Sequence, residues 1–145
     1  MPLYFAYGSN LSSTRLRERL GAVDIVGVAL LPDYRHCFDK HGADGTAKGN
    51  VVAAVGARVL GVVYEVDLDQ LSRLAVIEGG YRQMDVRVSV SDAAVVAVSF
   101  EALVRVHDLE PTADYLEHYR RGFVEHDFPE DYRRELLGIY SDHAR

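Results

Sequence analysis

The spacing of apolar residues predicts a strand-rich domain whose helices are short. Residues 3–7 are aromatic and apolar and end at a Gly-Ser-Asn sequence, which is typical of a strand followed by a tight turn. Residues 13–20 predict a short helix, because two leucines lie four positions apart among charged residues and a glycine follows. The chain should therefore begin with a strand, a turn and a helix.

β-Branched residues dominate the middle of the chain. They predict strands over residues 23–30, 51–55, 59–66, 86–90 and 96–106, and residues 34–38 are also taken as a strand. The two segments on either side of Ser91-Asp92 alternate between apolar and other side chains, which indicates a hairpin. Residues 42–49 contain three glycines and are expected to form a flexible hairpin loop.

Helical spacing occurs at three further places. Residues 68–76 predict a short helix that places Glu78 at a helix-to-strand junction. Pro111-Thr112 offers a helix start before an apolar face, and a second short helix is expected after Pro129. Strands outnumber helices, so we expect an α+β fold with a mostly antiparallel or mixed sheet, or a small β-barrel, as a single domain over residues 1–145.

Composition argues against several classes of partner. With 16 Lys and Arg residues against 22 Asp and Glu residues, the formal charge of −6 gives no attraction for nucleic acids or anionic membranes. The apolar runs are far shorter than the ~20 residues that span a bilayer, and residues 1–7 lack the basic start of an export signal. We therefore expect a cytoplasmic protein that binds neither nucleic acid nor membrane.

The sequence carries no short motif for phosphate, dinucleotide, serine-hydrolase or zinc-protease chemistry. Apart from His118 and His126, eight positions apart, the six histidines show no metal-ligand pairing, so we expect no metal site. Cys37 is the only cysteine, which excludes an internal disulfide. We interpret it as a buried structural thiol, because its neighbour His36 points to the opposite face of a strand.

Two features remain as candidates for chemistry. Residues 7–11, with the sequence Tyr-Gly-Ser-Asn-Leu, would collect free backbone N–H groups that can hold a carboxylate. Glu78 follows an apolar run and precedes two glycines, which favours partial burial. Each also has a plain structural interpretation: a turn with its cap in the first case, and an exposed turn glutamate or a partner of Arg82 in the second.

At these two features the sequence resembles the γ-glutamylcyclotransferase, or AIG2-like, family. The resemblance begins in residues 4–11, with the sequence Tyr-Phe-Ala-Tyr-Gly-Ser-Asn-Leu, and residues 61–66, with the sequence Gly-Val-Val-Tyr-Glu-Val. It continues through Glu78-Gly79, Tyr81-Arg82 and residues 126–132, and so covers nearly the whole chain.

The resemblance implies a small mixed β-barrel with flanking short helices, and it implies an activity. In the family reaction, the α-amine of a small γ-glutamyl substrate attacks its own γ-carbonyl and releases 5-oxoproline without a cofactor or metal. By position, Glu78 takes the catalytic role of proton transfer. The substrate-binding residues that the resemblance implies are Tyr7, Gly8, Ser9, Asn10, Leu11 and Tyr81.

An ordinary glutamate is a poor base for this reaction, because proton transfer from an α-ammonium group is uphill by roughly 5 kcal/mol. We therefore predict that Glu78 is buried beside Ile77 and the turn and that its pKa is raised. Arg105 stands where relatives often have a tyrosine in the last strand, and the segment after Gly79 is short, which affects the specificity side of the pocket. These departures leave open a non-catalytic small-ligand binding module of the same fold, or an interaction protein that uses its acidic surface.

Overall fold

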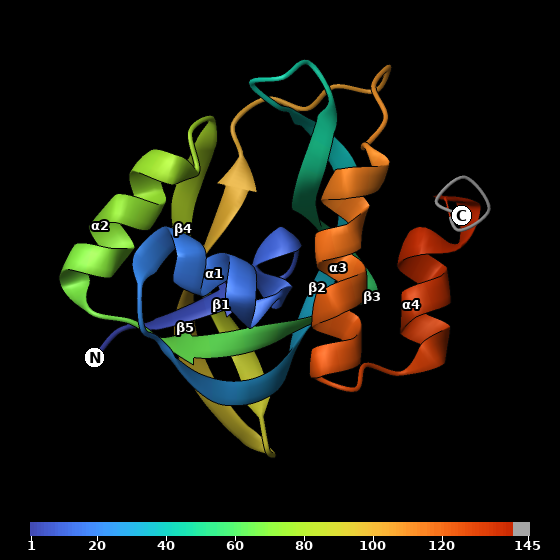
Figure 1. Ribbon diagram of the computed structural model, residues 1–145. Coiled ribbons are helices and arrows are strands. Elements are labelled where there is room, and N and C mark those ends of the chain that lie inside the picture. The colour runs from blue at the N-terminus through green and yellow to red at the C-terminus, as the bar shows by residue number, and fades with distance from the viewer. Residues whose placement is uncertain (141–145) are drawn as a thin grey trace.

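A computed structural model describes residues 1–140 and shows a closed five-stranded β-barrel with helices packed against it (Figure 1). The strands are β1 (Leu3–Ala6), β2 (Asp24–His41), β3 (Ala47–Glu65), β4 (Tyr81–Val90) and β5 (Ala93–Ala102). The helices are α1 (Ser13–Leu20), α2 (Leu68–Ile77), α3 (Ala113–Glu125) and α4 (Glu130–Leu137), with 3-10 turns η1 (Ser9–Leu11) and η2 (Gly138–Tyr140). The α+β class with a small mixed barrel is confirmed.

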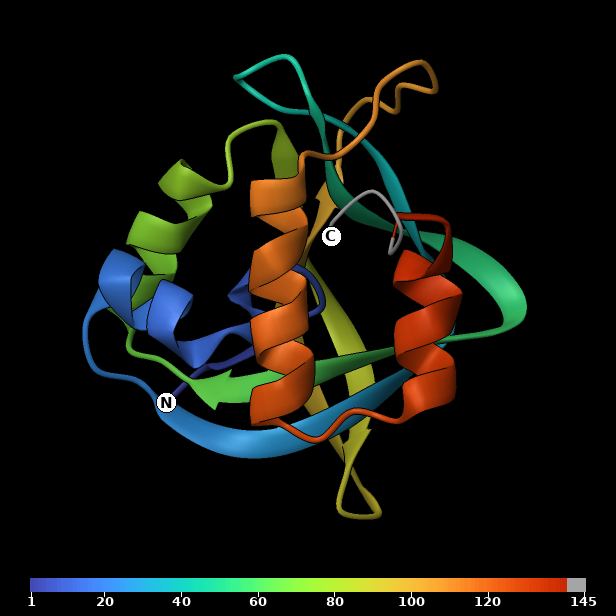
Figure 2. The ribbon, with the colours of Figure 1, turned by 45° about the vertical axis from the view of Figure 1, so that its right-hand side comes forward.

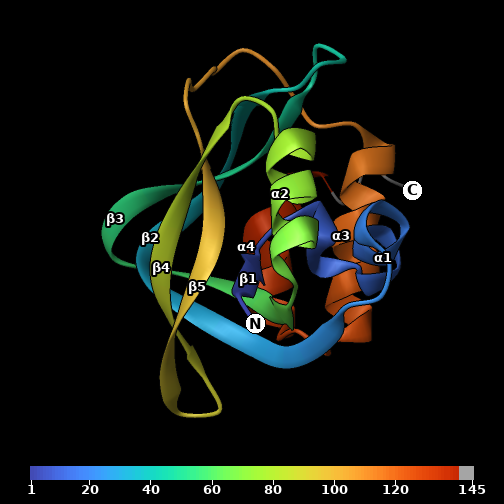
Figure 3. The same ribbon diagram turned by 90° about the vertical axis from the view of Figure 1, so that its left-hand side faces the viewer.

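The barrel closes through a short parallel contact. Its strand order is β1-β3-β2-β4-β5, and all neighbours are antiparallel except β1 and β5, which meet where Tyr4 lies opposite Val98. The helices gather on one side of the strands, and the turn of the β4–β5 hairpin lies away from them (Figure 3). Within residues 1–140, no helix is long and apolar enough to cross a membrane.

β2 and β3 form one long hairpin that bends around the barrel (Figure 2). Residues 54–57 of β3 bulge opposite Asp33, whose carboxylate accepts a 2.9 Å hydrogen bond from Gly56 N–H. Both residues have positive φ. The turn-forming residues that suggested breaks between strands therefore form a bulge within a continuous pair, and the predicted strands 51–55 and 59–66 are one strand.

Two further boundaries differ from the prediction. The expected flexible loop over residues 42–49 is shorter, because β3 already begins at Ala47. The strand predicted to reach residue 106 ends at Ala102, and the apolar side chains of Leu103 and Val104 are exposed. The predicted helices are confirmed, with Ser12 capping α1, Thr112 capping α3, and α2 extended by one residue.

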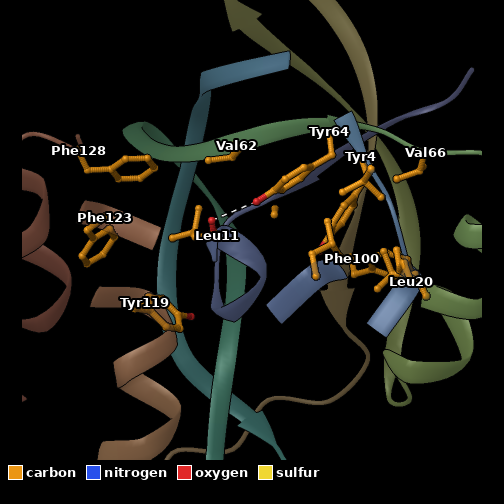
Figure 4. Packing of buried hydrophobic residues seen from close by; sticks show 14 of the residues in the cluster. Tyr4, Leu11, Leu20, Val62, Tyr64, Val66, Phe100, Tyr119, Phe123 and Phe128 are labelled. Atoms are coloured by element: carbon orange, nitrogen blue, oxygen red, sulfur yellow. Dashed lines mark hydrogen bonds between the residues drawn. The ribbon is translucent and has the colours of Figure 1, made fainter. Parts of the chain in front are cut away.

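The alternation of β1 divides the interior into two cores. Tyr4 and Ala6 belong to the larger core between barrel and helices, whereas Phe5 and Tyr7 belong to a second core formed by residues of the strands. Figure 4 shows the larger core, in which aromatic side chains from α3 and the barrel surround Leu11. The η1 turn is thus anchored by its own leucine.

Candidate active site

A small cavity of about 40 Å³ lies where the η1 turn meets the end of α2. It is lined by the turn residues 8–10, Glu78, Gly49, Phe100 and four tyrosines. The two features singled out in the sequence, 68 positions apart from Asn10 to Glu78, therefore border the same cavity.

Glu78 is the C-cap of α2, and its carboxylate faces the turn. The side chain is 18% exposed; Oε1 accepts a 3.3 Å hydrogen bond from Asn10 Nδ2 and lies 3.7 Å from Arg19 Nη1. Burial raises the pKa of Glu78, although nearby cations and Asn10 oppose the shift. The direction of the pKa shift agrees with the prediction, but Ile77 is 42% exposed, so the desolvation comes from the cavity walls instead.

The side chain of Asn10 joins the turn, the glutamate and the barrel. Its Nδ2 also donates to the Tyr4 hydroxyl at 3.0 Å, and its Oδ1 accepts from Arg19 Nη1 at 3.3 Å. Since Asn10 is 3% exposed, these bonds hold its amide in one orientation. Asn10 therefore fixes the position of the Glu78 carboxylate.

The backbone of the turn supplies possible anion ligands. The hydrogen bonds that close the turn run from Leu11 N–H to Gly8 O at 3.0 Å and from Ser12 N–H to Ser9 O at 3.4 Å, and neither uses the amide of Ser9 or Asn10. Two N–H groups on the cavity-lining residues can thus serve a carboxylate or an oxyanion. A Cβ at Gly8 would lie 2.9 Å from the hydroxyl oxygen of Tyr119, so this close packing requires glycine.

Two of the tyrosine hydroxyls in the wall are tied to the backbone. Tyr7 OH donates to Phe100 O at 2.6 Å, and Tyr81 OH donates to Gly49 O at 2.6 Å. Burial raises the pKa of both tyrosines well above the ordinary value. They therefore remain protonated at neutral pH, and Glu78 is the one carboxyl group among the residues that line the cavity.

The hydroxyl of Tyr115 also borders the cavity and packs beside a buried hydrogen bond. It accepts from Gly49 N–H at 2.8 Å, and its ring contacts that of Tyr119, whose hydroxyl shares a 2.7 Å hydrogen bond with His36 Nε2. Burial lowers the pKa of His36 to about 3, so the imidazole is neutral. Since Gly49 N–H donates to its oxygen, the O–H of Tyr115 is itself available as a donor.

The structure brings most of the predicted site residues together, with one correction. Leu11 does not line the cavity: its side chain is fully buried in the larger core, and its carbonyl accepts a 3.1 Å hydrogen bond from Tyr64 OH (Figure 4). Leu11 was included because it continues the motif, yet it serves to anchor the turn. The predicted residues that do line the cavity are Tyr7, Gly8, Ser9, Asn10, Glu78 and Tyr81.

Sequence reasoning missed Tyr4, Gly49, Phe100 and Tyr115 as cavity residues. The spacing pattern assigned Tyr115 to an apolar helix face. The available signal was that this face carries two tyrosines, Tyr115 and Tyr119, four positions apart, because tyrosine hydroxyls that become buried need hydrogen-bond partners. No local signal pointed to Gly49, whose contacts all come from distant segments.

Other sequence interpretations are resolved by side-chain partners. Arg82 pairs with Glu101 at 2.6 Å rather than with Glu78. Arg105 lies beyond β5, donates to Asp39 at 2.6 Å and is not among the residues that line the cavity. Cys37 is only partly buried, so the interpretation as a buried thiol is wrong.

Among residues 1–140, no three His, Cys, Asp or Glu side chains are grouped as metal ligands.

Comparison with known proteins identifies the family. Residues 58–136 match the AIG2-like family. The chain belongs to this γ-glutamylcyclotransferase family. It is 27% identical over 150 residues to γ-glutamylcyclotransferase from Bos taurus, covering 94% of this chain and 78% of that protein. It is 26% identical, with the same coverage, to the protein of that name from Homo sapiens.

Several solved structures share the fold. A γ-glutamyl cyclotransferase superposes with a TM-score of 0.84 at 24% identity, covering 92% of this chain and 85% of that one. YkqA from Bacillus subtilis superposes with a TM-score of 0.83 at 23% identity, covering 97% of this chain and 54% of that one. At such identities the superpositions establish the mixed barrel with its helices and nothing about substrate.

Proposed function

We propose that this protein is a γ-glutamyl cyclotransferase, which releases 5-oxoproline from a γ-glutamyl peptide, amine or other γ-glutamyl metabolite. One observation carries the proposal: a mostly buried carboxylate with a raised pKa, Glu78, borders the same small cavity as the turn amides of Ser9 and Asn10. Similarity to γ-glutamylcyclotransferases over 94% of the chain supports the same chemistry.

In the proposed reaction, Glu78 accepts a proton from the substrate's α-ammonium group, and the amine attacks the γ-carbonyl carbon. A C–N bond forms within the substrate and closes a five-membered ring, while negative charge develops on the γ-carbonyl oxygen. The original amide C–N bond then breaks as Glu78 protonates the leaving nitrogen. Two protons pass in all from the attacking to the leaving nitrogen, and Glu78 relays both, so it ends ionised as it began.

The environment of Glu78 suits both halves of this relay. A glutamate with an ordinary pKa would be a weak base toward an α-ammonium group. The raised pKa of Glu78 brings it closer to the pKa of that group. The same shift makes the protonated carboxyl available at the stage when the leaving nitrogen needs a proton. Holding the ring-closing conformer against the turn and Glu78 supplies the remaining advantage through orientation.

The reaction has two anionic groups, the substrate's α-carboxylate and the developing oxyanion. The cavity offers three donors for them: the amides of Ser9 and Asn10 and the hydroxyl of Tyr115. All three belong to residues held by the turn or by buried hydrogen bonds, so they are in place before the charge develops.

Glu78→Gln tests the proposal. The variant keeps an acceptor for Asn10 but cannot relay protons, so release of 5-oxoproline from γ-glutamyl substrates should fall by about 10²–10⁴-fold. Release is measured by mass spectrometry over a panel of γ-glutamyl amino acids, glutathione and γ-glutamyl amines.

Circular dichroism and thermal melting serve as the folding control for this variant. Turnover by Glu78→Gln at the wild-type rate would contradict the assigned role. Saturable binding of γ-glutamyl compounds by the wild-type protein, with no 5-oxoproline from any of them, would instead establish the non-catalytic binding module.

A further inference from the structure

A second hollow of about 380 Å³ begins where the inner cavity ends. The two share Ser9, Glu78, Tyr81 and Tyr115, so Glu78 lies on the boundary between them. We call this second hollow the outer groove. Its far walls come from α1 and from both arms of the β2–β3 hairpin (Figure 1).

The outer groove concentrates positive charge on a protein whose net charge is −6. Arg15 and Arg19 line it from α1, and Lys40 and Lys48 line it from the hairpin. The sequence contains two lysines in all, and both are in this groove. Apart from Glu78, its lining contains one carboxylate, that of Asp44.

Two of these four cations have no carboxylate partner in the part of the chain that the structure describes. Lys48 pairs with Asp44 at 3.2 Å and Arg19 lies 3.7 Å from Glu78, but within residues 1–140 neither Arg15 nor Lys40 has a carboxylate within 4 Å. Arg15 instead donates to Ser9 Oγ and contacts a histidine. The groove therefore has cationic capacity left for an anion.

Both lysine heads are held at the mouth of the inner cavity. Lys40 Nζ lies 4.9 Å from the centre of the Tyr81 ring, and Lys48 Nζ lies 4.5 Å from that of Tyr115. These are the two tyrosines that border both hollows. Cation–π contacts of this kind limit where a flexible lysine places its charge.

Size decides which part of a substrate meets these charges. A cavity of 40 Å³ has room for roughly three water-sized groups. A γ-glutamyl group is larger than that, so a bound substrate must continue past Glu78. Because Glu78 protonates the leaving nitrogen in the proposed reaction, the group attached to that nitrogen lies on the side of the outer groove.

We propose that the outer groove selects γ-glutamyl substrates whose leaving amine carries carboxylates, with a dicarboxylic amino acid preferred over a monocarboxylic one and a neutral alkylamine disfavoured. This inference rests on the proposed function. Lys40 and Arg15 each supply an unpaired positive charge for one carboxylate, and Lys48 adds a third that Asp44 neutralises in part. A simple alkylamine leaves these charges without a partner.

The test compares kcat/KM for 5-oxoproline release from γ-glutamyl-glutamate, γ-glutamyl-alanine and γ-glutamyl-ethylamine. The wild-type protein should favour them in that order. Lys40→Met should lower the ratio of the glutamate to the ethylamine substrate by roughly two- to fivefold, which corresponds to one partly screened charge pair. Lys40→Arg, which keeps the charge, should restore most of the ratio.

Arg87→Met is the matched control, because Arg87 is an exposed cation on β4 away from both hollows. It removes the same net charge and should leave the ratio at the wild-type value. Equal turnover of all three substrates, or a ratio that Lys40→Met does not change, would overturn the selection while leaving the cyclotransferase proposal intact. Failure of the wild-type protein to release 5-oxoproline from any substrate would instead overturn the proposed function.

Discussion

The inner cavity and the outer groove meet at Glu78 but are lined by different kinds of chemical group. The cavity is lined by backbone and by short or aromatic side chains whose polar groups are fixed by other buried groups, as in Tyr7 OH to Phe100 O. The groove is lined by long cationic side chains with unused charge. In the proposed reaction this difference divides the tasks: the cavity holds the reacting atoms in place, and the groove discriminates among leaving groups by electrostatics.

If the cavity depends on fixed packing, its most sensitive position should be Gly49. A Cβ there would collide with the Tyr119 hydroxyl and lie 3.1 Å from His36 Nε2 and 3.3 Å from Tyr115 OH. Gly49→Ala should therefore displace these three side chains. It should lower the free energy of unfolding by about 1–3 kcal/mol and reduce kcat by about 10²-fold or more. Urea unfolding and turnover assays measure the two effects.

Gly138→Ala is the control for this substitution, since a Cβ there would make only an ordinary contact at 3.6 Å from Arg134 Cγ. It should leave turnover unchanged. Wild-type activity in Gly49→Ala would show that the cavity tolerates movement of its wall, and the contrast with the groove would then be lost.

A smaller effect is expected from the hydrogen bond between Tyr119 and His36, which lies behind Tyr115. Tyr119→Phe leaves the buried His36 nitrogen without its partner and should cost about 1–3 kcal/mol of unfolding free energy. His36→Leu removes the imidazole and leaves the Tyr119 hydroxyl with one partner fewer. The double variant should be less destabilised than the sum of the two single variants, because it contains neither unpaired group.

Chemical denaturation of the four proteins gives this double-mutant cycle, and kcat and KM are measured alongside. We expect Tyr119→Phe to lower kcat more than it raises KM, because loss of the hydrogen bond to His36 lets the Tyr119 ring shift against the ring of Tyr115. Additive changes in unfolding free energy, with unchanged kcat and KM, would mean that Tyr119 and His36 contribute packing alone.

Much of the fold could be predicted from local sequence signals. The bounds of α1 follow from its leucine spacing and serine cap, and the β4–β5 hairpin follows from Ser91-Asp92, both of which adopt positive φ. Local signals failed where a turn-forming residue served a bulge, as at Gly56, whose N–H bonds to Asp33 across the strand pair. Barrel closure through Tyr4 and Val98 has no local signal, because it depends on where five strands meet.

The candidate site was predictable to the extent that it is continuous in sequence. Residues 7–11 and Glu78 were found from their local chemistry together with the family resemblance, and continuity of the motif also brought in Leu11 wrongly. The outer groove escaped notice because Lys40 and Lys48 belong to a segment interpreted as partly loop, and only the hairpin brings them beside α1. A surface assembled from three segments gives no pattern that periodicity can detect.

The smallest predicted effect concerns stability at the boundary between cavity and groove. The pKa of Glu78 is raised in the folded protein, so between the unfolded and folded pKa values the folded state binds more protons, and stability contributed by this group falls as pH rises through the folded pKa. Glu78→Gln removes the buried charge. The variant should therefore melt at a higher temperature than the wild type at neutral pH, and the difference should shrink as pH falls toward the ordinary glutamate pKa of about 4.3. Melting curves of both proteins across this pH range measure the difference. If the variant is less stable than the wild type at neutral pH, the attraction between Glu78 and Arg19 outweighs the desolvation of the carboxylate. Glu78 would then stabilise the fold as an ion-pair partner.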